Sequence, residues 1–180
     1  MKENNGVMYY LRITLVLLLI CGIIAGMLAA VNLLTKDRIA ENKVKEMNQK
    51  VATIFGEGVT RTELEHTPRK EVDYVWQVSR EGEDLGYCVY ITVRGYAGDI
   101  EMMVGMKPNG EIFGIEIVSM RETAGLGTRI GEDKFLSQYN GKSGKVTEND
   151  VDVISGSTVS SKAVIEGVNI ATDVYEEVKG

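Results

Sequence analysis

The sequence predicts an α+β protein in which one N-terminal transmembrane helix precedes a single domain, an antiparallel sheet flanked by helices. Three observations support this class: an uncharged apolar run near the N-terminus, alternating β-branched and aromatic residues in the middle of the chain, and an apolar helical stripe at its end. The length of 180 residues suits one domain with an appendage. We expect a tail and transmembrane helix over residues 1–35, a juxtamembrane helix over 36–55 and one domain over 56–180.

The apolar run extends from Ile13 to Leu34 without a charge. At about 1.5 Å per residue, a helix of this length matches a hydrocarbon core roughly 30 Å thick. It therefore predicts one spanning helix in contact with membrane lipid. A cleaved signal peptide is the alternative, with Leu28-Ala29-Ala30 as a poor cleavage site, but the run is longer than a typical signal-peptide core. A lipid-modified Cys21 is disfavoured because bulky Ile20 precedes it.

Charges outside this run bear on orientation and on partners. Lys2 and Arg12 precede the run, whereas four basic residues follow it within residues 36–45. Counting them favours a cytoplasmic domain, but the rule is weak where a large domain is translocated. Acidic residues outnumber basic ones by 26 to 20 in the whole chain. An acidic domain without a basic stripe excludes a nucleic-acid partner.

The middle of the chain predicts helix and then strands. Residues 36–55 have apolar side chains at helical spacing, so the helix is expected to continue beyond the membrane. Residues 56–68 are rich in turn formers. Val72 to Val78 and Tyr87 to Val93 alternate as strands do, and we expect them to pair through a turn at residues 81–84.

A second hairpin is the clearest local pattern. Ile100 to Met106 and residues 111–118 flank a Lys107-Pro108-Asn109-Gly110 turn, which predicts antiparallel pairing. A short helical piece is expected at residues 133–139. A last helix follows the serines near residue 157, since apolar residues lie on one stripe. That stripe contains Val164, Val168, Ala171, Val174, Tyr175 and Val178.

Cysteine and histidine give no sign of a metal site or a disulfide. Cys21 lies in the apolar run and Cys88 in a predicted strand, so the two are not expected to meet. Cys88 is interpreted as a small core residue. His66 is the only histidine, lies in a turn-rich stretch without a nearby nucleophile, and is interpreted as a solvated loop residue. We expect no metal.

Two segments match known phosphate-binding motifs only in part. Gly141-Lys142-Ser143 resembles the end of a P-loop, but Leu136 stands where that motif needs glycine. Gly125, Gly127 and Gly131 have the spacing GxGxxxG rather than GxGxxG, and no βαβ unit surrounds them. A nucleotide triphosphatase and a Rossmann enzyme are therefore disfavoured.

The most informative stretch is Asp152-Val153-Ile154-Ser155-Gly156-Ser157-Thr158, which we interpret as a short apolar strand running into the last helix. Small residues at 155–157 let a bulky group approach the backbone. Thr158 offers a hydroxyl at a helix N-terminus, where unpaired amides and the helix dipole stabilise a phosphate. A serine-rich helix cap with a glycine turn explains the same residues, and both interpretations stay open at this point.

These seven residues resemble the flavinylation motif of the FMN-binding domain family, Asp-x-x-(Ser/Thr)-Gly-(Ala/Ser)-(Thr/Ser). The resemblance implies FMN attached covalently to Thr158 through a phosphoester, after transfer from FAD by a flavin transferase. It makes Asp152 part of the signal that the transferase reads. It also implies that Ser155, Gly156 and Ser157 lie against the cofactor.

Two further segments carry the same resemblance. Glu122-Thr123-Ala124-Gly125-Leu126-Gly127 is similar to the family's Glu-Thr-Pro-Gly-Leu-Gly loop, with Ala124 in place of proline. This implies that Glu122, Thr123, Gly125, Leu126 and Gly127 lie beside the flavin. Gly95-Tyr96-Ala97-Gly98-Asp99-Ile100 is similar to the family's Gly-Tyr-x-Gly-x-Ile and adds Tyr96 as a cofactor-binding residue.

Within this family, one N-terminal helix and one short domain resemble most the G subunits of Rnf complexes, the ion-translocating membrane ferredoxin:NAD oxidoreductases. The related C subunits of sodium-translocating NADH:quinone reductases are usually longer. The resemblance implies an electron carrier with no catalytic residues of its own, other Rnf membrane subunits as partners, and a domain on the extracytoplasmic side of the cell membrane. The alternatives are a stand-alone flavinylated electron carrier and a membrane-anchored binding module without cofactor.

Overall fold

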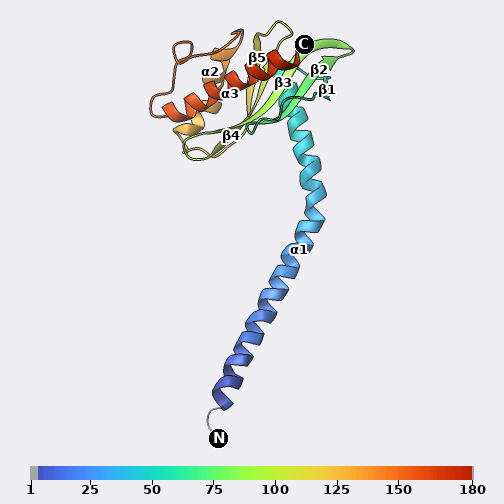
Figure 1. The fold of residues 1–180 in the computed structure, drawn as a ribbon, viewed down its shortest axis with the longest axis vertical. Helices are drawn as coiled ribbons and strands as arrows, with labels where there is room; N and C mark the ends of the chain where they lie inside the picture. The colour runs from blue at the N-terminus through green and yellow to red at the C-terminus, as the bar shows by residue number, and fades with distance from the viewer. Residues whose placement is uncertain (1–3, 180) are drawn as a thin grey trace. The chain divides into compact units, whose positions relative to one another are not determined.

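Residues 4–179 are described by a computed structural model of the chain (Figure 1). Lys2, in the predicted tail, lies outside the described residues. The chain forms two compact units that divide between Glu46 and Met47. Helix α1 (Asn4–Phe55) supplies the described part of the first unit and the beginning of the second.

The first unit contains an apolar helical stretch from Met8 to Lys36. This stretch is 29 residues long, and its side chains are exposed. With a rise of about 1.5 Å per residue it is long enough to cross a membrane. The predicted apolar N-terminal helix is therefore confirmed, and Cys21 is exposed on it.

Helix α1 continues past the apolar stretch and ends at Phe55, as the spacing over residues 36–55 predicts. Gly56 stops the helix because its φ of 87° is a left-handed conformation that favours glycine. The Gly56 N–H donates to the Ala52 carbonyl at 2.8 Å. Arg80 Nη2 donates to the Phe55 carbonyl at 2.6 Å. Backbone and side-chain donors thus close the C-terminal end of α1.

The second unit contains a five-stranded antiparallel sheet in the order β1-β2-β3-β4-β5. Its strands are β1 (Thr60–Glu63), β2 (Val72–Arg80), β3 (Glu83–Arg94), β4 (Asp99–Met106) and β5 (Ile112–Met120). The four predicted strands correspond to β2 to β5 and are confirmed. The prediction of turns throughout residues 56–68 is wrong at β1, which pairs with β2.

The turn between β2 and β3 is tighter than the sequence suggests. Arg80 pairs with Glu83, which leaves Glu81 and Gly82 as a two-residue turn. These two residues have φ values of 52° and 89°. Two successive positive φ angles are typical of the type I′ turn, whose twist matches that of the strands. The predicted turn over residues 81–84 is therefore too long, since Glu83 already belongs to β3.

The two faces of the sheet bury separate sets of side chains. Helix α3 (Thr158–Val178) lies over one face against β3 and β4 (Figure 1). The last turns of α1 pack on the other face. Along β3, Val89 and Ile91 join the α3 side, whereas Cys88 joins the α1 side, as the two-residue period of a strand requires. Burial raises the pKa of Cys88 to about 12, and its prediction as a core residue is confirmed.

Short helices and loops connect β5 to α3. They are η1 (Gly127–Gly131), α2 (Asp133–Leu136) and η2 (Ser137–Tyr139), so the helical piece predicted at residues 133–139 is confirmed. The short strand predicted at residues 152–154 is wrong, because these residues have no regular secondary structure. Gln138 Oε1, rather than a strand, accepts the Asp152 N–H at 2.6 Å. Val153 and Ile154 are apolar because they pack against the core on the α3 side.

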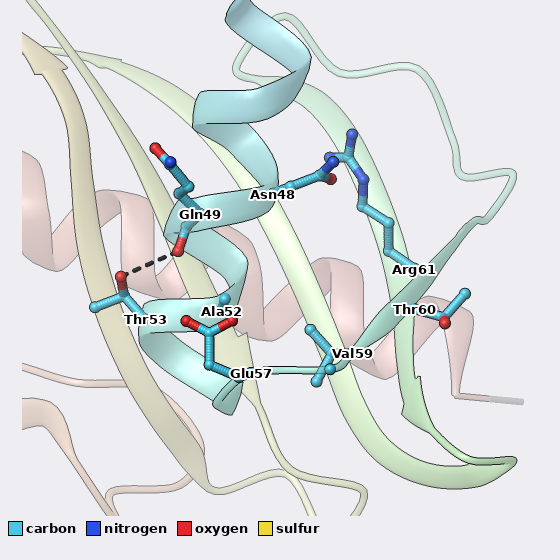
Figure 2. A pocket seen from close by; sticks show the side chains of 9 residues that line it. Asn48, Gln49, Ala52, Thr53, Glu57, Val59, Thr60 and Arg61 are labelled. Carbon is cyan, nitrogen blue, oxygen red and sulfur yellow. Dashed lines mark hydrogen bonds between the residues drawn. The ribbon is translucent and has the colours of Figure 1, made fainter.

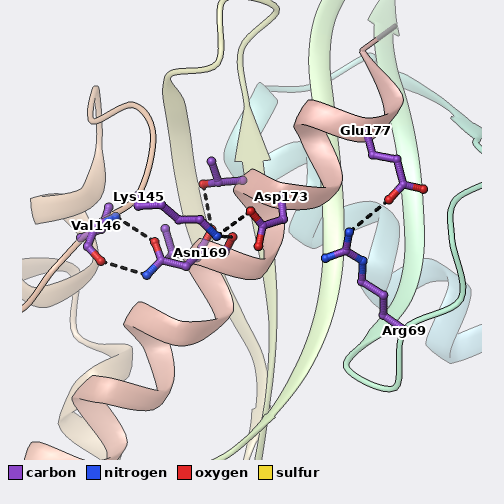
Figure 3. Close-up of polar contacts among 8 residues, drawn as sticks. Arg69, Lys145, Val146, Asn169, Asp173 and Glu177 are labelled. Atoms are coloured by element: carbon purple, nitrogen blue, oxygen red, sulfur yellow. Dashed lines mark hydrogen bonds and ion pairs between the residues drawn. The ribbon is translucent and has the colours of Figure 1, made fainter.

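Polar contacts along its outer face join α3 to neighbouring loops (Figure 3). The Asn169 side chain bonds both backbone groups of Val146, accepting at 2.8 Å and donating at 2.9 Å. Lys145 pairs with Asp173 at 2.6 Å, and Arg69 pairs with Glu177 at 3.2 Å. On the inner face the predicted stripe is confirmed: Val164, Val168, Ala171, Val174 and Tyr175 are buried and Val178 is partly buried.

Candidate functional site

The N-terminal end of α3 lies open. Thr158 is the first helical residue and is exposed, and Ser157 occupies the N-cap position without capping the helix through its side chain. Gly156 has a φ of 82°, which turns the chain into the helix. The Ser157 N–H donates to the Ile154 carbonyl at 2.9 Å. Thr158 therefore lies at the positive end of the helix dipole beside the first amides of α3, a setting that stabilises a negative group.

The loop at residues 122–127 follows the end of β5 and folds into a compact turn. The Thr123 carbonyl accepts the N–H groups of Leu126 at 3.1 Å and Thr128 at 3.3 Å. Thr128 Oγ1 accepts the Gly125 N–H at 3.0 Å, and Gly125 has a φ of 75°. The loop therefore holds its shape through its own hydrogen bonds, although Ala124 replaces the proline of the family's loop.

Glu122 joins this loop to the segment that connects β3 and β4. Its carboxylate accepts the Tyr96 N–H at 2.7 Å and the Ala97 N–H at 3.4 Å. A Cβ on Gly95 would lie 1.9 Å from Glu122 Oε1, and one on Gly127 would lie 2.6 Å from Oε2. Both glycines are thus needed for the carboxylate to reach these amides. Sequence reasoning placed Glu122 beside the flavin but missed this role as the link between two loops.

These three segments surround one pocket of about 370 Å³. Its volume lies within the range of small-molecule sites, roughly 300–1,000 Å³. It is lined by Tyr96, Glu122, Thr123, Leu126, Gly127, Gly156, Ser157, Thr158, Val159 and Ser160. The structure therefore brings together most of the site residues named from the sequence. Val159 and Ser160 were missed; both follow Thr158 in the first turn of α3, and helical geometry from an acceptor at Thr158 could have found them.

Three predicted site residues do not line the pocket. Gly125 and Ser155 flank it in sequence, and each shapes or precedes a segment that does line it. Asp152 is exposed, and its backbone N–H is held by Gln138. The position of Asp152 outside the pocket is compatible with recognition by another protein and not with direct contact to a ligand in the pocket.

The rim of the pocket is apolar and accessible. Tyr96 is 71% exposed, Leu126 47% and Val159 51%, although all three are large hydrophobic residues. Each comes from a different lining segment. A rim of this kind suits a flat aromatic group, whose faces bury apolar surface while polar atoms at the pocket floor fix the other end of the ligand.

A larger pocket of about 650 Å³ lies between the last turns of α1 and β1 (Figure 2). Arg61 lines it with its guanidinium carbon 4.5 Å from the centre of the Trp76 ring, and desolvation by burial lowers the pKa of Arg61. None of the predicted site residues lines this pocket. His66, half-buried in the loop after β1, lines neither pocket.

Comparison with known proteins agrees with the geometry of the smaller pocket. A family model described as the FMN-binding domain matches residues 95–173, a range that contains every residue lining that pocket. A second, the RnfG N-terminal region, matches residues 10–54. The chain is 30% identical to the G subunit of the Na(+)-translocating ferredoxin:NAD(+) oxidoreductase complex of Acetobacterium woodii, over 92% of this chain and 91% of that protein.

The chain belongs to the RnfG family. It is also 27% identical to the G subunit of the proton-translocating ferredoxin:NAD(+) oxidoreductase complex of Clostridium ljungdahlii, over 96% of this chain and 93% of that protein. The crystal structure of NqrC from Shewanella oneidensis has the same fold, with a TM-score of 0.60 and 17% identity over 75% of this chain and 94% of that one. This RnfG-family chain therefore has an apolar N-terminal helix and an FMN-binding domain of known fold.

Proposed function

We propose that this chain is the electron-carrier subunit of an ion-translocating ferredoxin:NAD oxidoreductase complex and that its FMN is joined through a phosphoester to Thr158. One observation carries the proposal: three segments distant in sequence meet around the exposed hydroxyl of Thr158 at an uncapped helix N-terminus. Membership of the RnfG family and the FMN-binding domain match support it.

The lining residues fit the two ends of FMN. The first turn of α3 offers unpaired amides and the positive end of the helix dipole to the phosphate. Tyr96, Leu126 and Val159 offer apolar surface to the ring system. Glu122 fixes the loops that carry Tyr96 and Leu126 relative to each other. Bound FMN supplies one-electron and two-electron redox chemistry, and the chain supplies attachment, orientation and a local environment.

The open rim fits a relay better than an enzyme with its own substrate. Exposed Tyr96, Leu126 and Val159 leave the pocket accessible from outside. A cofactor held there by one covalent bond is reachable by redox centres of neighbouring subunits. The proposal assigns ion transport to the assembled complex and no catalytic residue to this chain.

The same arrangement leaves the flavinylation motif accessible to a maturation enzyme. Thr158 and Asp152 are both exposed, so a separate flavin transferase has access to the acceptor and to the motif around it. The proposal places the domain on the extracytoplasmic side of the membrane, anchored by the Met8–Lys36 stretch of α1. Orientation rests on the resemblance to the family, which we weight above the count of flanking positive charges.

The decisive test replaces Thr158 by valine in a host that produces flavin transferase. Valine keeps the branched shape but lacks the hydroxyl, so we expect complete loss of covalent flavin with the fold retained. Intact mass and in-gel fluorescence of the denatured chain measure the attachment. Thr62→Val, at an exposed threonine of β1, is the matched control and should keep full flavin mass. A Thr158→Val chain that still carries FMN after denaturation would assign the linkage to another residue.

A second experiment separates the complex subunit from the stand-alone carrier. A tagged chain purified from its own membranes in mild detergent should bring down other membrane redox subunits. A flavinylated chain recovered alone would favour a carrier that works outside such a complex. A chain at its bare polypeptide mass from that same source would favour a binding module without cofactor.

A further inference from the structure

Four serine and threonine residues of the N-cap and body of α3 are buried, and they divide into two kinds. Ser161 Oγ accepts the Ile154 N–H at 3.2 Å, and Thr172 Oγ1 donates to the Val168 carbonyl at 3.0 Å. Ser157 and Ser160 are 5% and 2% exposed, and of their two hydroxyls only that of Ser157 is a buried group without a hydrogen-bond partner among the described residues. A buried hydroxyl without a partner is costly, so such groups call for an explanation.

The same two pairs of residues differ in whether they line the pocket at the start of α3. Ser157 and Ser160 both line it, whereas Ser161 and Thr172 do not. Ser157 is the N-cap residue and Ser160 lies three positions later, a spacing that puts two side chains on the same side of a helix. Thr158, the proposed acceptor, lies between them. Both side chains therefore line the same pocket as Thr158, where a phosphate on that residue would lie.

We infer that Ser157 and Ser160 form a phosphate seat, in which both hydroxyls donate to the non-bridging oxygens of the FMN phosphate beside the first amides of α3. The inference rests on the proposed function and adds two positioning residues to it. Serine exchanges among three staggered rotamers, so each hydroxyl turns to an acceptor that enters the pocket. The seat discriminates by charge: it binds the phosphate ester of a flavin and gains nothing from riboflavin, which lacks the phosphate.

The flavinylation motif accepts alanine or serine at the position of Ser157. Alanine there keeps the small size that the acceptor site requires and loses only the donor. The Ser157 hydroxyl is therefore not needed for attachment of the flavin. Its role in this inference is to orient and hold the phosphate.

The test uses the full chain in detergent, produced without flavin transferase, and titrates it with FMN and with riboflavin by fluorescence anisotropy. We expect the wild-type chain to prefer FMN. Ser157→Ala with Ser160→Ala should weaken FMN binding by about tenfold or more, since each lost bond is to a charged group, and should leave riboflavin binding within about twofold. Ser161→Ala is the matched control: it removes a buried hydroxyl of the same turn outside the pocket and should not change the ratio of the two affinities.

Several results would overturn the seat. A wild-type chain without preference for FMN over riboflavin excludes it, and so does a double variant that loses both ligands equally. On the flavinylated chain, a ³¹P resonance with the same chemical shift in wild type and double variant also excludes it. These outcomes are independent of the covalent linkage, because the intact mass of wild type and Thr158→Val decides that question separately.

Discussion

Two helix ends in the second unit, the C-terminal end of α1 and the N-terminal end of α3, differ in how their backbone groups are bonded. At the C-terminal end of α1, Gly56 and Arg80 both donate to backbone carbonyls of the last turn. At the N-terminal end of α3, Ser157 stands at the cap position and its hydroxyl bonds nothing. The closed end contributes stability, whereas the open end keeps donors available. Under the proposed function, this difference leaves the start of α3 available for an anionic ligand at some cost in free energy of unfolding.

Removing the donor at the closed end should have the largest effect on stability. Arg80→Ala leaves the partly buried Phe55 carbonyl without its charged donor, and we expect the free energy of unfolding to fall by about 2 kcal/mol. Flavin loading of the folded chain should not change. Urea titration followed by tryptophan fluorescence measures the effect, since Trp76 packs on the same face of the sheet.

Arg94→Ala is the control for Arg80. Arg94 pairs with Asp99 at 3.0 Å, but the two side chains are 70% and 55% exposed, so this pair is worth less than about 1 kcal/mol. Equal losses in the two variants would show that the closed end of α1 contributes no more than a surface ion pair. The claim that the donors at the C-terminal end of α1 contribute to stability would then be wrong.

Paired substitutions at the open end should give a smaller effect of unequal size. Ser161→Ala removes the acceptor of the Ile154 N–H, and we expect the chain without flavin to lose about 1 kcal/mol. Ser157→Ala removes a hydroxyl that bonds nothing, so the chain without flavin should lose less than about 0.5 kcal/mol or gain stability. Thermal unfolding of both variants without cofactor measures the difference. A larger loss for Ser157→Ala than for Ser161→Ala would mean that Ser157 caps the helix in solution.

Strands β2 to β5 were predictable because they are rich in apolar, β-branched and aromatic residues and because clear turn sequences separate them. The polar strand β1 was not, because Thr60-Arg61-Thr62-Glu63 has no apolar alternation and is a strand only through its pairing with β2. At residues 152–154 the error was the opposite one, because a strand was predicted where the structure has none. Val153 and Ile154 are apolar as strand residues are, but they contact the core from an irregular segment.

The site was predictable where one short segment carries the chemistry. Gly156, Ser157 and Thr158 are adjacent in sequence, and they line one wall of the pocket. The hydrogen bond from the Tyr96 N–H to Glu122 joins residues 26 positions apart, so no local sequence pattern predicts it. The unsatisfied Ser157 hydroxyl could not be predicted either, since only the packed helix shows which serines find a partner and which do not.

The smallest expected effect concerns the C-terminal half of α3, where Glu177 accepts hydrogen bonds from Thr67. Glu177 also pairs with Arg69, as Figure 3 shows. The hydrogen bonds from Thr67, with a smaller contribution from Arg69, lower the pKa of Glu177 below its usual 4.5. A carboxylate with a lowered pKa contributes stability above its unfolded pKa and loses it as the pH falls through the folded value. Wild type should therefore exceed Glu177→Gln in unfolding midpoint at neutral pH, and the two curves should converge below about pH 4.

Glu166→Gln, on the same helix but without an ion pair within residues 4–179, is the control for this titration. A Glu177→Gln difference that persists at acid pH would mean that the side chain acts through its shape and not through its charge. Flavin loading should be the same in both variants, because neither residue lines the pocket at the other end of the helix. A change in loading with Glu177→Gln would show that the two ends of α3 are coupled, and the open end could then no longer be treated as an independent site.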